Sequence, residues 1–274
     1  MQMPSNPPSR AARWFRKKVI RLGSGKLYHE FTSSGTITKA ALLQLVRNAD
    51  PTYASIKANQ VDIKIRCIGG GGGGGYGASV FYGGFPAAVN TESFSLDDLP
   101  DSISFVVGAG GAPAGDGGST TFWDVVAIGG KSGSTGSAED SNHSFMESNS
   151  LMRMGRRSLS NAAPSSPFGP GGGGYNSSSI PAKRNGGSSS SALPNARVIG
   201  PTANGAVGFD ASDANDRGFD SFGTGGAGNS STVGGGNGGK PGGGGGATSQ
   251  SSFPSTGYGA RGGIYLQFTV TEAA

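Results

Sequence analysis

The chain has 274 residues, of which 53 are glycine and 15 are proline, and this length allows one domain of about 200 residues with an N-terminal appendage. Its formal net charge of +5 comes from residues 1–29, which carry seven basic residues and no acidic one, whereas the rest of the chain holds 15 basic and 17 acidic residues, a balance of −2. That balance excludes an electrostatic case for nucleic-acid binding by the rest of the chain, so we expect no nucleic-acid partner.

Residues 1–27 are expected to form a basic attachment segment, separate from the rest of the chain. Ser9 is a candidate helix N-cap and Gly23 a C-terminal stop, and the residues between them place an apolar stripe beside a basic one, which is typical of a short helix. We expect this helix to dock onto an acidic partner protein; a helix on a membrane surface and a transit peptide are the alternatives. No apolar run approaches the roughly 20 residues that span a membrane, so we expect no membrane insertion. The residues expected to make the attachment are Arg13, Trp14, Phe15, Lys17 and Lys18.

Two elements are expected before the glycine-rich part of the chain. Residues 38–47 have the pattern of a short amphipathic helix. Residues 61–68 alternate between apolar and polar side chains, which predicts a half-buried strand with Cys67, and the residues two, four and six positions before it, on the buried face. Because Cys67 is the only cysteine and takes an inward position, we expect a packed apolar residue rather than a nucleophile, a disulfide or a metal ligand.

Seven consecutive glycines, Gly69 to Gly75, follow that strand directly. Ordering them costs on the order of 7–14 kcal/mol of backbone entropy with no side chain to offset it, so the run is either a flexible linker or is held by backbone hydrogen bonds to other segments. The rest of the chain favours order, because strand-like stretches recur between the glycine clusters, at residues 102–107, 120–128 and 262–270. A disordered, low-complexity chain is the alternative, since glycine and proline together make up about a quarter of the residues.

Ordered glycine runs have a plausible geometry in the polyproline II conformation, with three residues per turn, a rise of about 3.1 Å per residue and no internal hydrogen bonds. The N–H and C=O groups of such a rod point sideways and need partners when they are buried. Several rods packed side by side would supply these partners, provided that no Cβ atom blocks their approach. The three-residue glycine period of collagen is absent, so a collagen triple helix is excluded.

A short motif and the order of the elements carry a resemblance to a known family. Residues 31–36, Phe-Thr-Ser-Ser-Gly-Thr, come before a strand that ends at Ile68-Gly69 and a long glycine run; further glycine clusters and a closing strand follow. In this order the chain, from Tyr28 to its C-terminus, resembles the glycine-rich domain of bacteriophage tail-fibre tips and is similar in style to the receptor-recognising adhesin of T-even-like phages. In that family, packed polyglycine II helices form a sandwich, and variable loops between the glycine motifs touch the bacterial surface. The helix expected at residues 38–47 stands where the family has a short turn.

The resemblance implies a mainly β fold with polyglycine II helices, namely a strand-framed, glycine-rich sandwich with long loops over residues 28–274, next to the short N-terminal helix. It also implies a non-enzymatic virion protein of the phage tail, at the distal fibre or tip, that docks on an upstream tail protein and binds a bacterial surface receptor (a protein, a pilus or lipopolysaccharide). Whether one copy or three, a homotrimer, sit on each fibre stays open. Aromatic residues with polar neighbours in glycine-bounded loops are the expected receptor contacts, although such rings also turn inward to cap a core. These residues are Phe81, Tyr82, Phe85, Phe209, Arg217, Phe219, Phe222, Phe253 and Tyr258.

Motifs for other functions fail on inspection. Residues 234–240 begin like a phosphate-binding loop, but Pro241 follows where Ser or Thr is needed. The aspartates between residues 210 and 220 lack the spacing and the closing glutamate of a calcium loop, and neither histidine has a carboxylate at ligand spacing. We therefore expect no metal, no cofactor and no catalytic residue. The alternative function is a structural tail or baseplate protein whose glycine-rich domain holds neighbouring subunits together.

Overall fold

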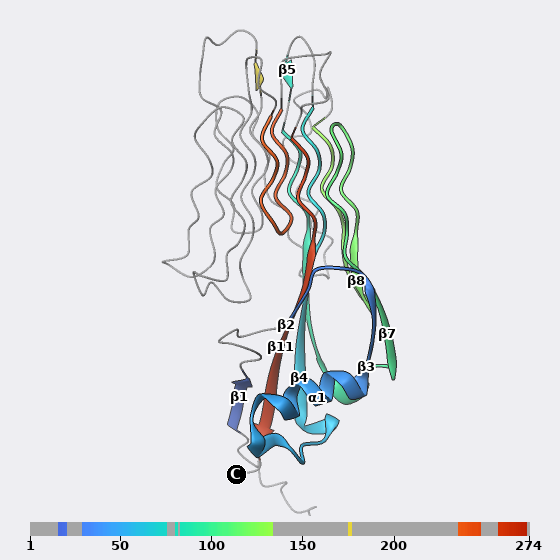
Figure 1. Cartoon of the computed structure of the whole chain (residues 1–274), viewed down its shortest axis with the longest axis vertical. Coiled ribbons are helices and arrows are strands. Elements are labelled where there is room, and N and C mark those ends of the chain that lie inside the picture. The colour runs from blue at the N-terminus through green and yellow to red at the C-terminus, as the bar shows by residue number, and fades with distance from the viewer. Residues whose placement is uncertain are drawn as a thin grey trace, which may run out of the picture.

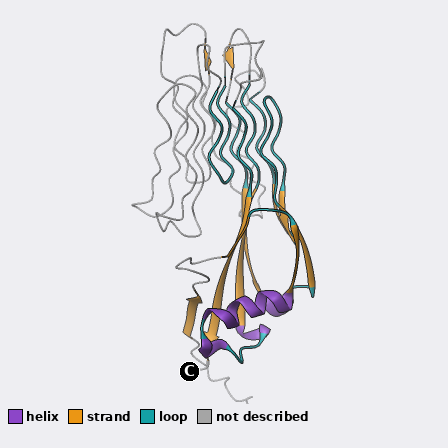
Figure 2. Ribbon diagram, in the orientation of Figure 1, coloured by secondary structure: helices purple, strands orange, loops and turns teal. Residues whose placement is uncertain are grey.

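The computed structural model describes residues 16–20, 29–75, 80–81, 83–133, 175–176, 235–247 and 257–272. They form two parts that follow one another along the long axis of the molecule: a strand sandwich with a helix, and a set of glycine-rich segments lying side by side, which we call the glycine array (Figure 1). The proximal end of the molecule carries the helix and the C-terminus. The distal end is the opposite one, where β5 (Val80–Phe81) lies (Figures 1 and 2).

A five-stranded antiparallel sheet forms one layer of the sandwich, in the order β1-β11-β4-β6. Its strands are β1 (Arg16–Ile20), β2 (His29–Phe31), β4 (Val61–Ile68), β6 (Val89–Ser95) and β11 (Gly263–Glu272). One edge of β11 pairs with β4, while β1 and β2 share its other edge, at residues 268–272 and 264–266. The closing strand is therefore the centre of this layer, although it comes last in the chain.

A four-stranded antiparallel sheet forms the second layer, in the order β3-β7-β8-β9. Its strands are β3 (Gly35–Thr38), β7 (Ser102–Val106), β8 (Thr120–Phe122) and β9 (Val125–Ala127). Short 3-10 helices occupy Pro51–Tyr53, Ala58–Gln60 and Leu96–Asp98, and β5 forms a separate two-stranded ladder with β10 (Tyr175–Asn176). Strands β8 and β9 pack against β4, which brings the two layers face to face.

The hydrophobic core lies between the two sheets. Alternate residues of β4 and β11 face it, and both Ile63 and Phe268 are fully buried. Three rings from different strands pack together in the core: Phe31 and Phe105 are tilted with centroids 4.5 Å apart, and Phe105 and Phe122 are stacked with centroids 5.9 Å apart. Each such side chain contributes roughly 1.5–3 kcal/mol when fully buried, so this core gives the glycine array a rigid base.

Helix α1 (Lys39–Ala49) closes the proximal end of the sandwich (Figure 1). Its N-cap is Thr38, whose Oγ1 accepts a hydrogen bond from the Ala41 N–H at 3.1 Å. Leu42 and Val46, four residues apart, lie on one face of the helix and are fully buried in the core. The amphipathic helix predicted at residues 38–47 is confirmed.

Most of the predicted strands are confirmed. The strand predicted at residues 61–68 has these bounds in the structure, and its predicted buried face, including Cys67, is fully or almost fully buried. The stretches at 102–107 and 262–270 form β7 and β11. The stretch at 120–128 forms two strands instead of one, because the chain turns back at Trp123, whose φ is 51°, and Asp124.

The prediction of an N-terminal helix is wrong at residues 16–20, which form strand β1. The reason is tertiary: β1 pairs with residues 268–272 of β11, whose N–H and C=O groups would otherwise lie on an open edge. A helix this short is marginal on its own in water, so a sheet edge competes successfully for the segment. The rest of the predicted helix lies outside the described residues, and the separation of residues 1–27 as a unit stays a prediction.

Candidate functional site: the distal end of the glycine array

Six segments of the glycine array are direct continuations of strands of the sandwich. Residues 69–75, 107–114 and 128–133 leave β4, β7 and β9, and residues 83–88, 115–119 and 257–262 lead into β6, β8 and β11. Two further segments, 235–239 and 243–247, are joined by a turn at residues 240–242. The sandwich therefore determines where most of the array segments start, and Figure 2 shows them continuing the strands as loops.

The segment Gly69 to Gly75 runs through the middle of the array and is buried along its whole length. Its N–H groups donate to three neighbouring segments in turn, and residues three apart donate to the same neighbour. Gly69 and Gly72 donate to Ala88 and Phe85 (3.1 and 2.9 Å), Gly70 and Gly73 to Gly118 and Gly115 (both 2.9 Å), and Gly71 and Gly74 to Ala260 and Gly257 (2.8 and 2.9 Å).

The carbonyl groups of the same segment accept hydrogen bonds from three other neighbours. Gly70 and Gly73 accept from Gly130 and Gly133 (both 2.8 Å), Gly71 and Gly74 from Gly111 and Ala114 (2.8 and 2.9 Å), and Gly72 from Gly245 (2.9 Å). The central segment thus has six hydrogen-bonded neighbours. Of the two explanations of the glycine run left open by the sequence, a flexible linker is wrong and retention by backbone hydrogen bonds is confirmed.

Only glycine fits in this central segment. A Cβ atom built on any residue from Gly69 to Gly74 would lie closer than 3.0 Å to a backbone carbonyl of a neighbouring segment, a distance that real Cβ atoms essentially never show. The carbonyl again belongs to the same neighbour every third residue, with Ile128 and Lys131 facing Gly69 and Gly72. The absence of side chains is therefore what lets the buried residues Gly69 to Gly74 form backbone hydrogen bonds between segments.

A buried threonine joins the array to the sandwich. The Oγ1 of Thr120 donates to the Ile68 carbonyl at 2.7 Å and accepts from the Gly108 N–H at 2.9 Å, and the residue is fully buried. These two bonds tie the ends of β4 and β7 to the start of β8 at the level where the glycine segments begin. Thr120 was not identified in the sequence, because its role depends on three strands that are separate in the chain.

The described array segments have their free ends, where the chain continues into residues that the structure does not describe, at the distal end. The described residues that precede or follow residues 76–79, 134–174, 177–234 and 248–256 are Gly75, Val80, Gly133, Tyr175, Asn176, Gly235, Ala247 and Gly257. Backbone hydrogen bonds show that several of these residues lie at the same height along the array. The Gly74 N–H donates to Gly257, the Gly74 carbonyl accepts from Ala114, and the Gly73 carbonyl accepts from Gly133. By contrast, the turn at residues 240–242 lies at the sandwich end, where a Cβ on Gly242, whose φ is 74°, would meet Ile68.

Three of the nine predicted receptor-binding residues lie among the described residues. Phe81 is in β5, at the distal end, and pairs with Tyr175 of β10, a residue that the sequence analysis did not select (Figure 1). Tyr258 is 50% exposed, and its N–H donates to Asn237 Oδ1 at 2.9 Å. Phe85 is half-buried, and its N–H and C=O both bond within the array. The others, Tyr82, Phe209, Arg217, Phe219, Phe222 and Phe253, lie outside the described residues.

The predicted attachment residues lie toward the other end of the molecule. Lys17 and Lys18 belong to β1, which is near the C-terminus and α1 in Figure 1. Arg13, Trp14 and Phe15 lie outside the described residues. Phe81, at the distal end, is therefore separated from Lys17 and Lys18 by the length of the array, whereas Phe85 pairs with Gly72, partway along it.

The composition, the glycine array and the closing strand agree with one known sequence family, the glycine-rich domain, whose profile matches residues 48–269. The chain belongs to the glycine-rich domain family. No curated protein matches it in sequence. The family match covers β4 to β11 and all of the described array, but it says nothing of phage tail fibres, so that resemblance stays a prediction.

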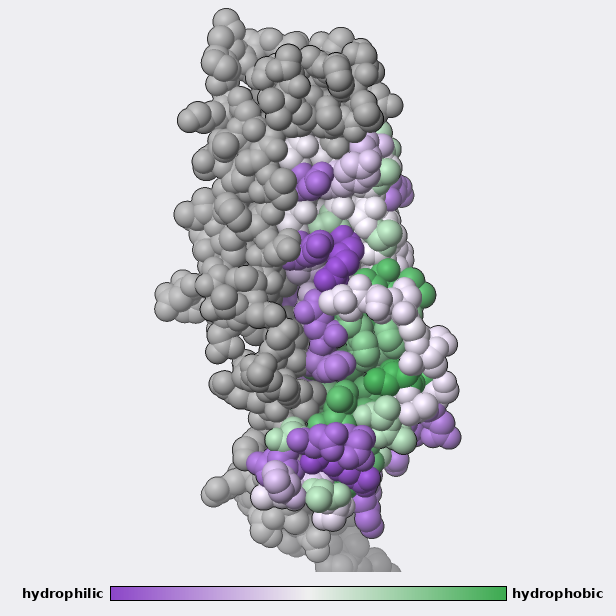
Figure 3. All heavy atoms as spheres, viewed as in Figure 1, coloured by the Kyte–Doolittle hydropathy of each residue, from purple (hydrophilic) through white to green (hydrophobic). Residues whose placement is uncertain are grey.

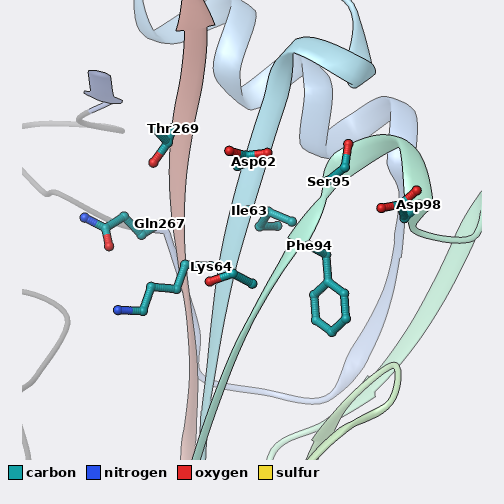
Figure 4. Close-up of a pocket in the computed structure, with 9 residues that line it drawn as sticks. Asp62, Ile63, Lys64, Phe94, Ser95, Asp98, Gln267 and Thr269 are labelled. Carbon is teal, nitrogen blue, oxygen red and sulfur yellow. The ribbon is translucent and has the colours of Figure 1, made fainter. Parts of the chain in front are cut away.

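This glycine-rich domain also has an open groove on the outer face of the five-stranded sheet (Figure 4). The groove has a volume of about 450 Å³ and lies near the proximal end, away from β5. Cross-strand pairing places Lys64 between Gln267 and Ser93, and Asp62 between Thr269 and Ser95. Its lining is polar and contains both signs of charge, but it is distant from the array connections, so we do not assign receptor binding to it.

Chemistry based on metals or thiols has little support in the described part of the glycine-rich domain. Its His, Cys, Asp and Glu residues form no group of three or more that could hold a metal ion. Burial, with a smaller contribution from Glu92, raises the pKa of the Cys67 thiol far above its ordinary value, so the thiol stays protonated and unreactive. Cys67 is buried in the core cluster, as the sequence predicted. Among the described helices, none is long and apolar enough to cross a membrane.

Proposed function

We propose that this glycine-rich domain is a receptor-binding tip of a phage tail fibre, in which packed polyglycine II helices hold recognition loops at one end. Support for this conformation comes from the central segment, where hydrogen-bond partners repeat every three residues and six neighbours surround one rod. A polyglycine II rod has three residues per turn and no internal hydrogen bonds, so its backbone groups point toward neighbours all around it. Backbone bonds then replace the missing side-chain contacts.

The observation that carries the functional proposal is that several described array segments end at the distal end, next to the residues that connect them along the chain. Recognition residues concentrate in loops that are positioned by a rigid scaffold. In this protein the proposed scaffold is the sandwich and the hydrogen-bonded array. Phe81, Tyr82 and Phe85, together with the aromatic residues at 209–222, 253 and 258, are the proposed contacts.

The proposed mechanism is reversible binding of several loops to a bacterial surface receptor, with avidity from the many fibres of one virion. The receptor class is an outer-membrane protein, a pilus or lipopolysaccharide. The basic N-terminal segment, residues 1–27, would attach the domain to an acidic upstream tail protein at the proximal end. No chemical reaction is part of this mechanism.

The experiment that tests the proposal replaces the distal connection at residues 76–82 with a Gly-Ser segment of equal length in the complete phage. The expected result is normal particle assembly with adsorption to host cells reduced at least about tenfold, which corresponds to roughly 1.4 kcal/mol of binding free energy. As a control, Asp124→Ser changes an exposed residue in the β8–β9 turn of the sandwich and should leave adsorption unchanged. Failure of particles to assemble after the distal replacement would favour the structural tail protein instead.

A further inference from the structure

The outer face of the four-stranded sheet carries most of the exposed apolar side chains in the described part of the chain. The described part of the chain has four exposed large hydrophobic residues, and three of them, Val106 (49%), Val126 (38%) and Ile128 (47%), lie on this face or directly after its last strand. The fourth, Tyr258, lies in the glycine array. In Figure 3, the hydrophobic surface gathers over the sandwich, at the right of the view. Apolar side chains that are contiguous on one face indicate an interaction surface more strongly than scattered ones do.

Strand pairing shows that these residues share one face. Val106 of β7 pairs with Thr121 of β8, and Thr121 pairs with Val126 of β9, so the three form one row across adjacent strands. Ile128 follows Val126 by two residues, with the buried Ala127 between them. Successive side chains of a strand point to opposite faces, so this row points away from the core.

The rest of the same face is short, polar and uncharged. Thr36 and Thr38 of β3 pair with Ser104 and Ser102 of β7, and all four are exposed. The outer face of the four-stranded sheet, which we call the uncharged face, therefore consists of the residues Thr36, Thr38, Ser102, Ser104, Val106, Thr121, Val126 and Ile128. None of these side chains is long, so a second sheet can approach to the roughly 10 Å at which two sheets pack.

The outer face of the other sheet is different. Its exposed rows carry Asp62 and Lys64, and its upper part carries Glu30 and Arg261 as an ion pair at 3.8 Å. A surface that packs on a copy of itself brings like residues together around the symmetry axis, so charges there repel one another unless they are paired. Of the two outer faces, only the uncharged face avoids this repulsion entirely.

We propose that the uncharged face binds the uncharged face of a second copy of this chain, in a side-by-side pair. The apolar row Val106–Thr121–Val126 forms the centre of the contact, and the hydroxyl groups of the neighbouring rows form its rim. Such a pairing covers the flank of the sandwich and leaves the array connections and the β1 edge free. For the proposed function, on which this consequence rests, it would place two receptor-binding tips side by side on one fibre.

The test measures the mass of the full chain by light scattering and sedimentation at micromolar concentration. We expect twice the monomer mass, and a dissociation constant that rises at least about tenfold in Val106→Glu and in Val126→Glu, because each substitution places two like charges at the centre of the contact. The matched control is Ser93→Glu, which adds the same charge to an exposed strand position of the other sheet and should not change the dissociation constant.

A milder variant guards against misfolding. Val106→Thr keeps the shape and the β-branch but replaces a methyl group by a hydroxyl, and it should weaken pairing while the melting temperature at low concentration stays that of the wild type. A monomer at every micromolar concentration would overturn the proposal. An unchanged dissociation constant in the folded glutamate variants would also overturn it. If the glutamate variants do not fold, an unchanged dissociation constant in Val106→Thr would do the same. Loss of pairing with normal adsorption of bacteria would overturn only the link to avidity, whereas normal pairing without adsorption would overturn only the proposed function.

Discussion

Replacing Gly72 with alanine tests whether the glycine array is a packed, hydrogen-bonded structure. The substitution adds a single methyl group in the middle of the buried central segment. The new Cβ would lie 2.5 Å from the carbonyl carbon of Lys131 and 2.9 Å from the carbonyl oxygen of Gly130. Both atoms belong to the backbone of a neighbouring segment, so neither can rotate away as the end of a side chain would. The two segments must therefore separate.

The cost follows from the contacts that this separation strains. Overpacking costs roughly 1–3 kcal/mol. The hydrogen bonds that join these two segments run from the Gly130 N–H to the Gly70 carbonyl and from the Gly133 N–H to the Gly73 carbonyl, both 2.8 Å. All four residues are buried, and leaving one buried group unsatisfied costs roughly 1–3 kcal/mol. We therefore expect a loss of about 2–6 kcal/mol in the free energy of unfolding, a large part of the roughly 5–15 kcal/mol that stabilises a typical domain. In a domain of this size each kcal/mol lowers the melting temperature by about 2–4 °C, so the melting temperature should fall by roughly 4–24 °C.

The assay is urea unfolding and thermal melting of the purified chain, with Gly115→Ala as the matched control. A Cβ on Gly115 would lie 3.1 Å from the Ala112 carbonyl oxygen, which a small shift relieves, and the residue is only partly buried. Alanine there also reduces the entropy of the unfolded chain, so the control should stay within about 1 kcal/mol of the wild type. A soluble Gly72→Ala protein with the wild-type melting temperature would refute the packed array.

Three other predictions concern the junction, an ion pair and the distal loops. Thr120→Val should lower the free energy of unfolding by about 1–3 kcal/mol, because the Gly108 N–H loses its partner; urea unfolding measures this, and no loss would contradict the junction role. Asp116 forms an ion pair with the Lys131 Nζ at 2.7 Å and accepts a hydrogen bond from the Ser132 N–H at 2.8 Å. Its partial burial raises its pKa, but these hydrogen bonds and the charge of Lys131 lower the pKa by more, so the net shift is downward. The ionised Asp116 carboxylate therefore stabilises the fold at pH values above its unfolded pKa of about 3.9, and this stabilisation is lost as the pH falls through its folded pKa. Asp116→Asn should therefore destabilise the protein near neutral pH but not well below about pH 3. A difference that persisted in acid would contradict this. Replacing Phe219 and Phe222 together with serine should leave melting nearly unchanged and reduce adsorption of the phage at least about tenfold, whereas unfolding would mean that these rings belong to a core.

Strand β4 was predictable because its alternating residues face a core on one side and solvent on most of the other. Strand β6 was not, because its inward positions include Asn90, which is 4% exposed, and Glu92, so the sequence shows no apolar alternation. The N-terminal segment was misread for the opposite reason. Its local pattern fits a helix, but the edge of β11, 250 residues away in the chain, makes residues 16–20 a strand.

The sequence could predict that the glycine segments pack as rods, but not which segments lie next to one another. Seven adjacent glycines allow neighbouring backbones to approach, which is why the sequence indicated packed rods. However, a glycine has no side chain that could specify its neighbour. The strands of the sandwich make that choice, since they fix where segments such as 83–88 and 128–133 enter the array. Residues 128–133, which include Ile128 and Lys131, could be recognised as array members only in the fold.

The most direct test of the proposed function is binding of the purified, labelled chain to intact bacteria. Cells that the phage infects would be compared with resistant mutants that have lost a surface receptor, with an excess of unlabelled chain as competitor. We predict saturable binding to the susceptible cells that the competitor removes, and only background binding to the resistant ones. Equal binding to both kinds of cell, or none to either by a chain that melts cooperatively, would contradict the proposal that this glycine-rich domain recognises a bacterial receptor.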